Sequence, residues 1–297
     1  MKGVFTTQAI PSYDDLPEQR YHFPRTYLRQ AEATVGDWIV YYEPRRQSAG
    51  ATTARGRSAY FATARVVRVR PDPGRDDHFY ADVADYLGFD RPVPFSEGQR
   101  YFEAALRRAD GGTSKGAFGR SVRTLADREF ETIVTAGFAP LVGDVATERS
   151  AAWELDEEPA VFEHPLVERL TTRPFRDAAF AVAVKRAYAD TCAVTGLKII
   201  NGGGRAEAQA AHIRPVQHDG PDSVRNGLAL SATAHWMFDR GLVSVDDDYT
   251  ILIARDRVPD AAARLFLPEG RVLVPERPDW RPHPQFLRYH RDAVFKG

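Results

Sequence analysis

The sequence lacks several features that define large classes of proteins. Its 297 residues include a single cysteine, Cys192, which excludes an intramolecular disulfide and any multi-cysteine zinc site. No stretch approaches the roughly 20 consecutive apolar residues that a membrane-spanning helix needs. The first residues, MKGVFTTQAIPSYDD, contain no apolar core of the kind found in a secretory signal. We therefore expect a cytoplasmic protein with no membrane association.

The chain also lacks an excess of either charge, since 40 lysines and arginines stand against 41 acidic residues. The charges are nevertheless unevenly distributed. Eight arginines and one acid lie between positions 44 and 75, a second basic run covers 107–128, and 148–158 carries mainly acidic charges. Clustered cations in a neutral chain favour a local phosphate-binding surface. A solvated arginine-rich face without a ligand is the alternative.

The length fits about two domains. In the first part, VGDWIVYYEP and SAYFATARVVRVRPDP are typical of β-strands, and the polar, basic segment 45–57 between them predicts a long loop. LADREFETIVTAGF has the apolar spacing of an amphipathic helix. We expect a compact barrel-like sheet with a few helices over 1–145, followed by an aperiodic acidic linker over 146–165.

The remaining residues, 166–297, mix helical and strand patterns. TTRPFRDAAFAVAVKRAYADT predicts a helix, because Phe180, Val184 and Tyr188 are four apart and share one face. A glycine-rich turn, a short strand, a helix over SATAHWMFDRG and short strands in LVSVDD and YTILIA follow. The histidine of FLRYHRDAVF, His290, is expected to be structural, on a C-terminal helix. The whole chain is therefore predicted to be α+β.

Four polar residues within this part form an unusual group: His212, Asn226, His235 and Asp239. On a helix, His235 and Asp239 project from one face and could hold one divalent ion, such as Mg, Mn, Zn or Ni. His212, at the end of the preceding strand, could take a proton from water, and the Asn226 amide could fix the intervening loop. The alternatives are a buried structural role for His235 and a bond from Asp239 to the backbone of the following turn.

The elements CAVTG, AHIRP, NGLALS and HWMFDRGL, in this order, resemble the HNH motif of the ββα-metal nucleases over roughly 174–254. The resemblance implies that His212 is the general base, that Asn226 holds the loop and that His235 binds the metal. Asp239 stands where some members carry a second helical ligand. Together these residues would hydrolyse a phosphodiester bond, with a divalent metal ion as cofactor.

The sequence departs from the family at one position. Many HNH sites have a metal-binding Asp or His directly before the base, where this chain has Ala211. Three residues of the following loop, His218, Asp219 and Asp222, are candidate helpers. The departure also leaves open a nucleic-acid-binding protein whose nuclease site is degenerate.

The segment YHFPRTYLRQAEATVGDWIVYYEPRR resembles the opening of a PUA-like barrel, the superfamily of EVE and SRA modules. Such a reader joined to an HNH domain resembles the modification-dependent restriction endonucleases of the McrA type. The resemblance implies that a modified cytosine is flipped out of the duplex into the first domain. The predicted substrate-binding residues are Tyr21, Phe23, Asp37, Trp38, Tyr42, Arg45, Arg46 and Arg57. The alternative is that the aromatic residues pack the barrel.

The predicted function is thus a metal-dependent endonuclease for double-stranded DNA that carries methylated or hydroxymethylated cytosine. An HNH nuclease that acts on unmodified DNA or on RNA is the alternative within enzymes. Because double-strand cleavage needs two cuts and one HNH site makes one, a homodimer on DNA is favoured.

Overall fold

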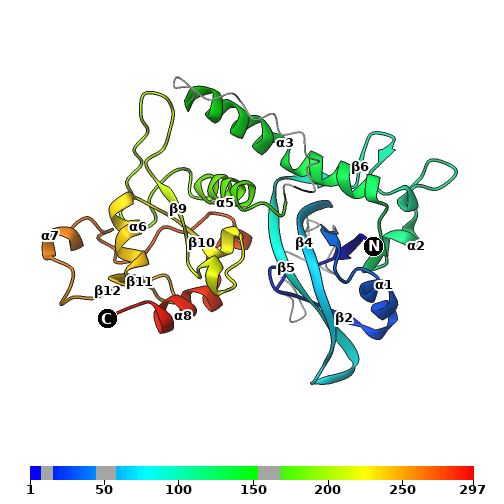
Figure 1. The fold of residues 1–297 in the computed structure, drawn as a ribbon, viewed down its shortest axis with the longest axis horizontal. Helices are drawn as coiled ribbons and strands as arrows, with labels where there is room; N and C mark the ends of the chain where they lie inside the picture. The colour runs from blue at the N-terminus through cyan, green and yellow to red at the C-terminus, as the bar shows by residue number, and fades with distance from the viewer. Residues whose placement is uncertain (8–15, 45–57, 153–167, 169) are drawn as a thin grey trace, which may run out of the picture. The chain divides into compact units, whose positions relative to one another are not determined.

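The computed structural model describes residues 1–7, 16–44, 58–152, 168 and 170–297, and of 140–152 only the backbone. Two compact units result, Met1–Arg176 and Asp177–Gly297 (Figure 1). No helix in the described part of the chain is long and apolar enough to cross a membrane.

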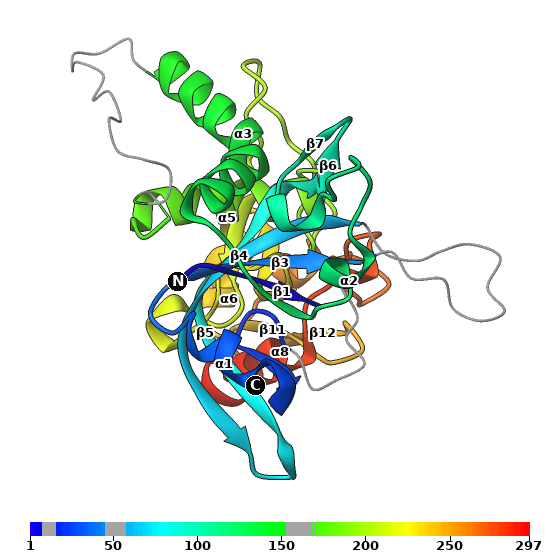
Figure 2. The same cartoon turned by 90° about the vertical axis from the view of Figure 1, so that its right-hand side faces the viewer.

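The first unit is built on a six-stranded mixed sheet (Figures 1 and 2). Its strands are β1 (Gly3–Thr6), β2 (Arg20–Pro24), β3 (Trp38–Glu43), β4 (Ala59–Asp72), β5 (Arg75–Pro94) and β8 (Val122–Thr124). The strand order is β2-β5-β4-β3-β1-β8, in which only β1 and β3 pair in parallel. Strands β4 and β5 form a long hairpin, and several register shifts between them bend it.

The sheet curls around an apolar core without closing into the expected barrel. Its inner face buries Phe5, Tyr21, Phe23, Ile39, Tyr41 and the residues packed with them. Across the opening, the Tyr21 hydroxyl on β2 donates to the Thr6 carbonyl at the end of β1, at 3.0 Å. Among the described residues, the edge strands β2 and β8 have no backbone pairing with each other. A side-chain bond thus bridges the gap, and the sheet is a half-barrel.

Short elements and one long helix complete the first unit. They are η1 (Arg25–Tyr27), α1 (Leu28–Glu32), β6 (Ser96–Glu97), β7 (Arg100–Tyr101), η2 (Ala104–Leu106), α2 (Lys115–Phe118) and α3 (Asp127–Ala152). The predicted amphipathic helix is confirmed as α3, with Phe130, Ile133 and Val134 fully buried. It continues through positions 146–152 of the predicted linker, and 153–165 lie outside the described residues.

The second unit is a small α+β domain around a ββα arrangement. Its elements are α5 (Arg173–Ala187, which begins in the first unit), β9 (Gln209–His212), η3 (Val216–His218), η4 (Val224–Asn226), β10 (Gly227–Leu230), α6 (Ala232–Asp239), β11 (Val243–Val245), β12 (Ile251–Ile253), α7 (Asp260–Ala263), η5 (Pro278–Trp280) and α8 (Pro284–Ala293). Strands β9 and β10 form an antiparallel hairpin, and α6 follows directly (Figure 1).

The predicted stripe on α5 packs on this hairpin. Phe180, Val184 and Tyr188 are all buried in the core of the second unit, as the four-residue spacing indicated. Gly227, which opens β10, allows the close approach, since a Cβ there would lie 2.4 Å from Val184 Cγ2. Cys192 is a buried free thiol in the same core, as expected. The helix α5 is thereby fixed beside the strand end that carries His212.

Candidate active site

His212 is the last residue of β9 and lies opposite Gly227 of β10. Its ring is stacked on the ring of Phe180, with centroids 3.7 Å apart and 10° between the planes. Its Nε2 lies 2.9 Å from Oδ1 of Asp222, a side chain that is only 1% exposed, whereas the His212 side chain is 19% exposed. A carboxylate oxygen accepts, so Nε2 carries the proton. In the described part of the chain no group bonds Nδ1, whose lone pair is therefore available.

The loop that brings Asp222 to His212 is clamped by Asn226. The Asn226 amide nitrogen donates to the carbonyls of Arg214 (2.9 Å) and Pro221 (3.0 Å), and its oxygen accepts from the Arg214 backbone N–H at 2.9 Å. Gly220 is needed at the crossing, because a Cβ there would lie 1.8 Å from the Arg214 carbonyl oxygen. Asn226 is fully buried, so its three bonds are shielded from water. The loop is closed at both ends, and the position of Asp222 is fixed.

His235 lies on α6 and makes contacts through both ring nitrogens. Its Nδ1 is 2.9 Å from Oε1 of Gln209, and its Nε2 is 3.5 Å from Oδ2 of Asp239. Because an amide oxygen only accepts, Nδ1 carries a proton, and in the neutral ring Nε2 presents its lone pair on the side of Asp239. Gln209 and Ala211 lie on the same face of β9, and Ala211 is fully buried in the core. On this face of β9, the side chain that contacts α6 is therefore that of Gln209, through His235.

The donor geometry on α6 fits a divalent ion. Two protein ligands about 2.0–2.2 Å from one ion in a tetrahedral arrangement lie roughly 3.4 Å apart, close to the separation of Nε2 and Oδ2. A metal-binding histidine usually donates its other N–H to an oxygen that orients the ring, as His235 does to Gln209. No group of three His, Cys, Asp or Glu that could hold a metal occurs among the described residues. The remaining ligands would therefore be water and substrate oxygens.

The three predicted helper residues do not join this pair. Asp222 is engaged by His212. The ring of His218 packs against that of Tyr289, with centroids 6.0 Å apart, and the Asp219 side chain is 98% exposed. The expectation that the 218–222 loop supplies metal ligands finds no support in this geometry. The loop supplies the partner of the base instead.

A cavity of about 590 Å³ lies beside His235. Its wall includes Gln209, two cations, Lys185 from α5 and Arg205 from the glycine-rich turn, and one acid, Glu207, whose carboxylate accepts from the Ala232 N–H at 2.8 Å. Trp236, the next residue along α6, is 58% exposed, which is unusual for so large an apolar side chain. The surface next to the candidate metal ligands is thus basic and partly apolar, which suits a polyanion.

Sequence reasoning missed two residues of this site. Gln209 has a weak signal, since it is two positions before Ala211 and so on the same strand face. Asp222 was considered as a metal ligand, and its pairing with His212 depends on the path of the ten-residue loop, which no spacing rule gives.

The aromatic residues predicted to line a base pocket are buried on opposite faces of the sheet, Tyr21 and Phe23 on β2 and Trp38 and Tyr42 on β3. Tyr21 and Phe23 pack with Ile39 inside the half-barrel. Trp38 and Tyr42 alternate with Ile39 and so lie on the other face, where the ring of Phe118 meets Tyr42 edge-on, with centroids 5.4 Å apart. All four predicted side chains are less than 7% exposed. The structure does not bring them together in an open pocket, because both faces of the strand are covered.

Asp37 is also engaged within the chain. Its carboxylate binds the N-terminal ammonium of Met1 at 2.9 Å and Nζ of Lys2 at 3.0 Å, and it accepts from the Trp38 N–H at 2.7 Å. Burial works to raise the pKa of Asp37, but these partners outweigh it and lower the pKa. The acceptor proposed for a flipped base is thus already satisfied. Arg45, Arg46 and Arg57 lie outside the described residues.

The comparisons with known proteins identify the domain that carries the site. Residues 192–246 match the family described as HNH endonuclease. No curated protein matches the chain.

Three solved structures resemble this chain, each with low sequence identity and a low TM-score. A modification-dependent TagI restriction endonuclease has 16% identity and a TM-score of 0.32, over 98% of this chain and 81% of that one. The N-terminal domain of Staphylothermus marinus McrB has 12% identity and a TM-score of 0.31, over 46% and 94%. The type IV phosphorothioation-dependent restriction endonuclease ScoMcrA has 13% identity and a TM-score of 0.19, over 79% and 46%. TM-scores of this size do not establish a common fold.

Proposed function

We propose that this chain, an endonuclease by virtue of the HNH domain at 192–246, is a metal-dependent DNA endonuclease whose general base is His212. One observation carries the proposal. The His212 ring is fixed on Phe180, its Nε2 is bonded to a buried carboxylate, and Nδ1 is left open. A histidine held in this way is prepared to take a proton, whereas a structural histidine would have both nitrogens bonded.

The proton transfer follows from these contacts. Nδ1 accepts a proton from the water that attacks phosphorus, and the ring becomes an imidazolium. Asp222 stabilises that cation through Nε2–H and holds the ring in one tautomer, as the carboxylate of a catalytic triad does. Stacking on Phe180 prevents the ring from turning away. Asn226 acts one step further out, since it closes the loop that carries Asp222.

His235 and Asp239 would hold the divalent ion, which is Mg, Mn or another divalent transition metal. When bound, such an ion polarises the phosphate and stabilises the charge that develops on the leaving oxygen. Gln209 keeps the lone pair of His235 Nε2 directed towards Asp239. Lys185 and Arg205 in the adjoining cavity supply cations for the neighbouring phosphates.

We infer that the site is active although Ala211 supplies no ligand. Ala211 is buried in the core, and the proposed ion would be held by His235, Asp239, water and substrate oxygens. The two helical donors stand at a separation suited to one ion, and the base has its partner. The geometry therefore favours an active nuclease over a protein that only binds nucleic acid.

The proposed substrate is double-stranded DNA with a modified cytosine. An HNH site contacts the backbone and carries no base preference of its own, so selection has to come from another part of the chain. The first unit, with its resemblance to PUA-like readers, is the candidate reader, and the flipped base would bind away from Trp38 and Tyr42. A homodimer would supply the two cuts of a double-strand break.

The experiment compares one plasmid in methylated, hydroxymethylated and unmodified form, with Mg, Mn or Ni ions or with a chelator. We expect ion-dependent cleavage, strongest on modified DNA and absent in His212→Ala. Equal cleavage of all forms would establish an HNH nuclease without modification dependence. No cleavage with any ion would leave a binding protein. Sizing on a specific duplex tests the dimer, which a monomer making concerted double-strand cuts would contradict.

A further inference from the structure

We propose that a basic groove at residues 99–109 of the first unit binds the phosphodiester backbone of duplex DNA; this rests on the proposed nuclease function. The groove has a volume of about 580 Å³. Its wall includes three arginines, Arg100, Arg107 and Arg108, together with Tyr101 and Ala104. Arg107 and Arg108 belong to the second basic run of the sequence, 107–128, and Arg100 precedes it.

The walls of the groove are two hairpins that are tied together. The first is β6–β7, and the second is closed by a bridge between Arg107 and Thr113 and by a bond from the Arg108 N–H to the Gly112 carbonyl, at 2.7 Å. The Tyr101 hydroxyl on the first hairpin lies 2.7 Å from Oγ1 of Thr113 on the second. The groove is therefore preformed, which reduces the entropy lost when a ligand binds.

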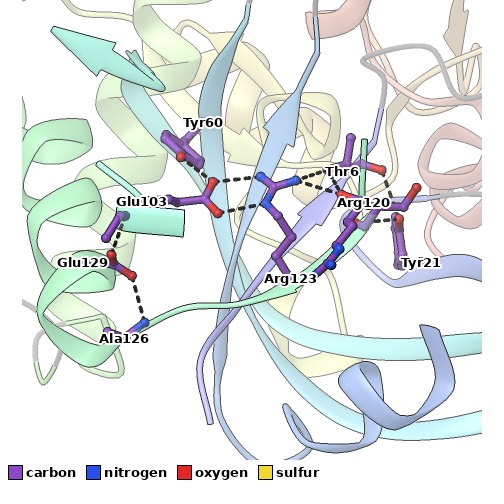
Figure 3. Close-up of polar contacts among 10 residues, drawn as sticks. Thr6, Tyr21, Tyr60, Glu103, Arg120, Arg123, Ala126 and Glu129 are labelled. Carbon is purple, nitrogen blue, oxygen red and sulfur yellow. Dashed lines mark hydrogen bonds and ion pairs between the residues drawn. The ribbon is translucent and has the colours of Figure 1, made fainter. Parts of the chain in front are cut away.

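The segment that carries Ala104, a residue of the groove wall, is anchored to the sheet by a buried ion pair (Figure 3). Glu103, directly before η2, accepts from Nε and Nη2 of Arg123 on β8, each at 2.8 Å, and from the Tyr60 hydroxyl at 2.6 Å. Glu129 of α3 accepts from the N–H of Ala104 at 2.7 Å. Burying a charged pair is unfavourable unless its bonds are satisfied, and here the two carboxylate oxygens share three donors. This anchor gives the arginines of the rim a fixed base.

Three arginines of the first basic run, all on β4, are paired with carboxylates within the sheet. Arg68 and Arg70 both contact Oδ2 of Asp82, at 2.7 and 3.0 Å, and Arg65 lies 2.8 Å from Oδ2 of Asp85. Burial works to raise the pKa of Asp82, but the two arginines outweigh it and lower the pKa. Those cations are committed to structural pairs.

The arginines of the groove have fewer carboxylate partners than those on β4. Within the described ranges, no carboxylate lies within 4.0 Å of Arg100 or Arg107, and Arg108 meets only the exposed Asp110, at 2.8 Å. The guanidinium of Arg100 is further placed by the ring of Phe102, at 5.6 Å. Guanidinium groups bind phosphate oxygens in a bidentate manner, so a preformed groove in which Arg100 and Arg107 have no carboxylate partner among the described residues is suited to a phosphodiester backbone. Such contacts orient the duplex and carry no sequence information.

The test measures binding without cleavage, in the full chain with His212→Ala and a chelator. A short labelled duplex is titrated at several salt concentrations against the triple variant Arg100→Gln, Arg107→Gln and Arg108→Gln. The control triple, Arg29→Gln, Arg75→Gln and Arg91→Gln, removes the same charge from exposed sites of the same unit. The helix α1, which carries Arg29, lies well away from β6 in both views (Figures 1 and 2).

We expect the groove variant to lose affinity by on the order of tenfold or more and the slope of log Kd against log salt to fall by roughly 2.7, or about 0.9 for each lost phosphate contact. The control should change both far less. Equal changes in the two variants would overturn the groove while leaving the nuclease proposal intact. A parent chain that binds no duplex would overturn both. Weakened binding of single-stranded RNA alone would also contradict the groove as a DNA site.

Discussion

Two histidines of the second unit lie on a phenylalanine ring in the same way, yet their polar surroundings differ. His212 stacks on Phe180 and His290 on Phe238, each with centroids 3.7 Å apart and with 10° and 11° between the planes. His290 donates from Nε2 to the Phe238 carbonyl at 3.1 Å and accepts at Nδ1 from the Ser244 hydroxyl at 2.8 Å. Both of its nitrogens are therefore bonded to neutral groups.

The difference shows what separates a candidate base from a structural residue. Burial lowers the pKa of His290 to about 4, although its bond to the Phe238 carbonyl works in the other direction. It stays neutral and joins α8 to α6. His212 has the same aromatic support, but a carboxylate partner and one open nitrogen. Ring stacking fixes the orientation in both, and the polar partners decide whether a proton can be taken up.

The first prediction concerns a variant that lacks the unbonded Nδ1 of His212. His212→Ala should lower the cleavage rate about 100-fold or more, because a positioned base contributes that much to the chemical step. DNA affinity should hardly change, since the base adds nothing to the basic surface. Single-turnover cleavage and duplex titration measure the two quantities. Residual activity within about tenfold of the parent would remove His212 from this role.

The second prediction concerns the ligand pair on α6. His235→Ala should lose both cleavage and metal affinity, and Asp239→Asn should lose less, because its amide oxygen can still bind weakly. Gln209→Leu serves as a positioning variant and should weaken metal affinity by roughly tenfold. Calorimetric titration of Mn into each variant without DNA is the measurement. Unchanged affinity in the first two would place the ion elsewhere.

The third prediction concerns a substitution that gives His212 a neutral polar partner, as His290 has. Asp222→Asn replaces the carboxylate by a neutral group, and kcat should fall by at least on the order of tenfold with little change in KM. The ¹⁵N shifts of the His212 ring should show that the Nε2–H tautomer is no longer fixed. A purely structural role for Asp222 would leave the tautomer unchanged. In the background of His212→Ala, Asp222→Asn should cause little further loss, since the two act as a unit.

The second unit could largely be predicted from its sequence because its signals are local. Helical spacing placed Phe180 and Val184 in the core of the unit, and the four-residue spacing of His235 and Asp239 placed both on one helix face. The pairing of His212 with Asp222, in contrast, could not be predicted from a local spacing. It depends on a loop closed by Asn226, and the sequence shows the asparagine without showing where the loop leads.

The first unit was harder to predict for a physical reason. Alternation along β3 separates Trp38 and Tyr42 from Ile39, but it cannot tell whether the second face is open or covered. Here it is covered, and burial raises the pKa of Tyr42 to about 12. A ligand pocket and a second core have the same aromatic, β-branched composition. The buried pair of Glu103 and Arg123 is likewise 20 residues apart in the sequence and follows no motif.

The last prediction tests the structural histidine, and it should leave cleavage at neutral pH unchanged. The pKa of His290 is about 4 in the folded chain and 6.5 unfolded, so between these values the unfolded state binds more protons. Its contribution to the free energy of unfolding is therefore complete above pH 6.5 and is lost as the pH falls towards 4. The gap corresponds to on the order of 3 kcal/mol, at about 1.4 kcal/mol for each pKa unit. His290→Gln should flatten this loss when hydrogen exchange of the α6 and α8 amides is followed from pH 7 to 5. Burial also lowers the pKa of His22, so the difference between variant and parent is what reports His290. Equal pH dependence in the two chains would show that His290 does not titrate as a buried neutral group.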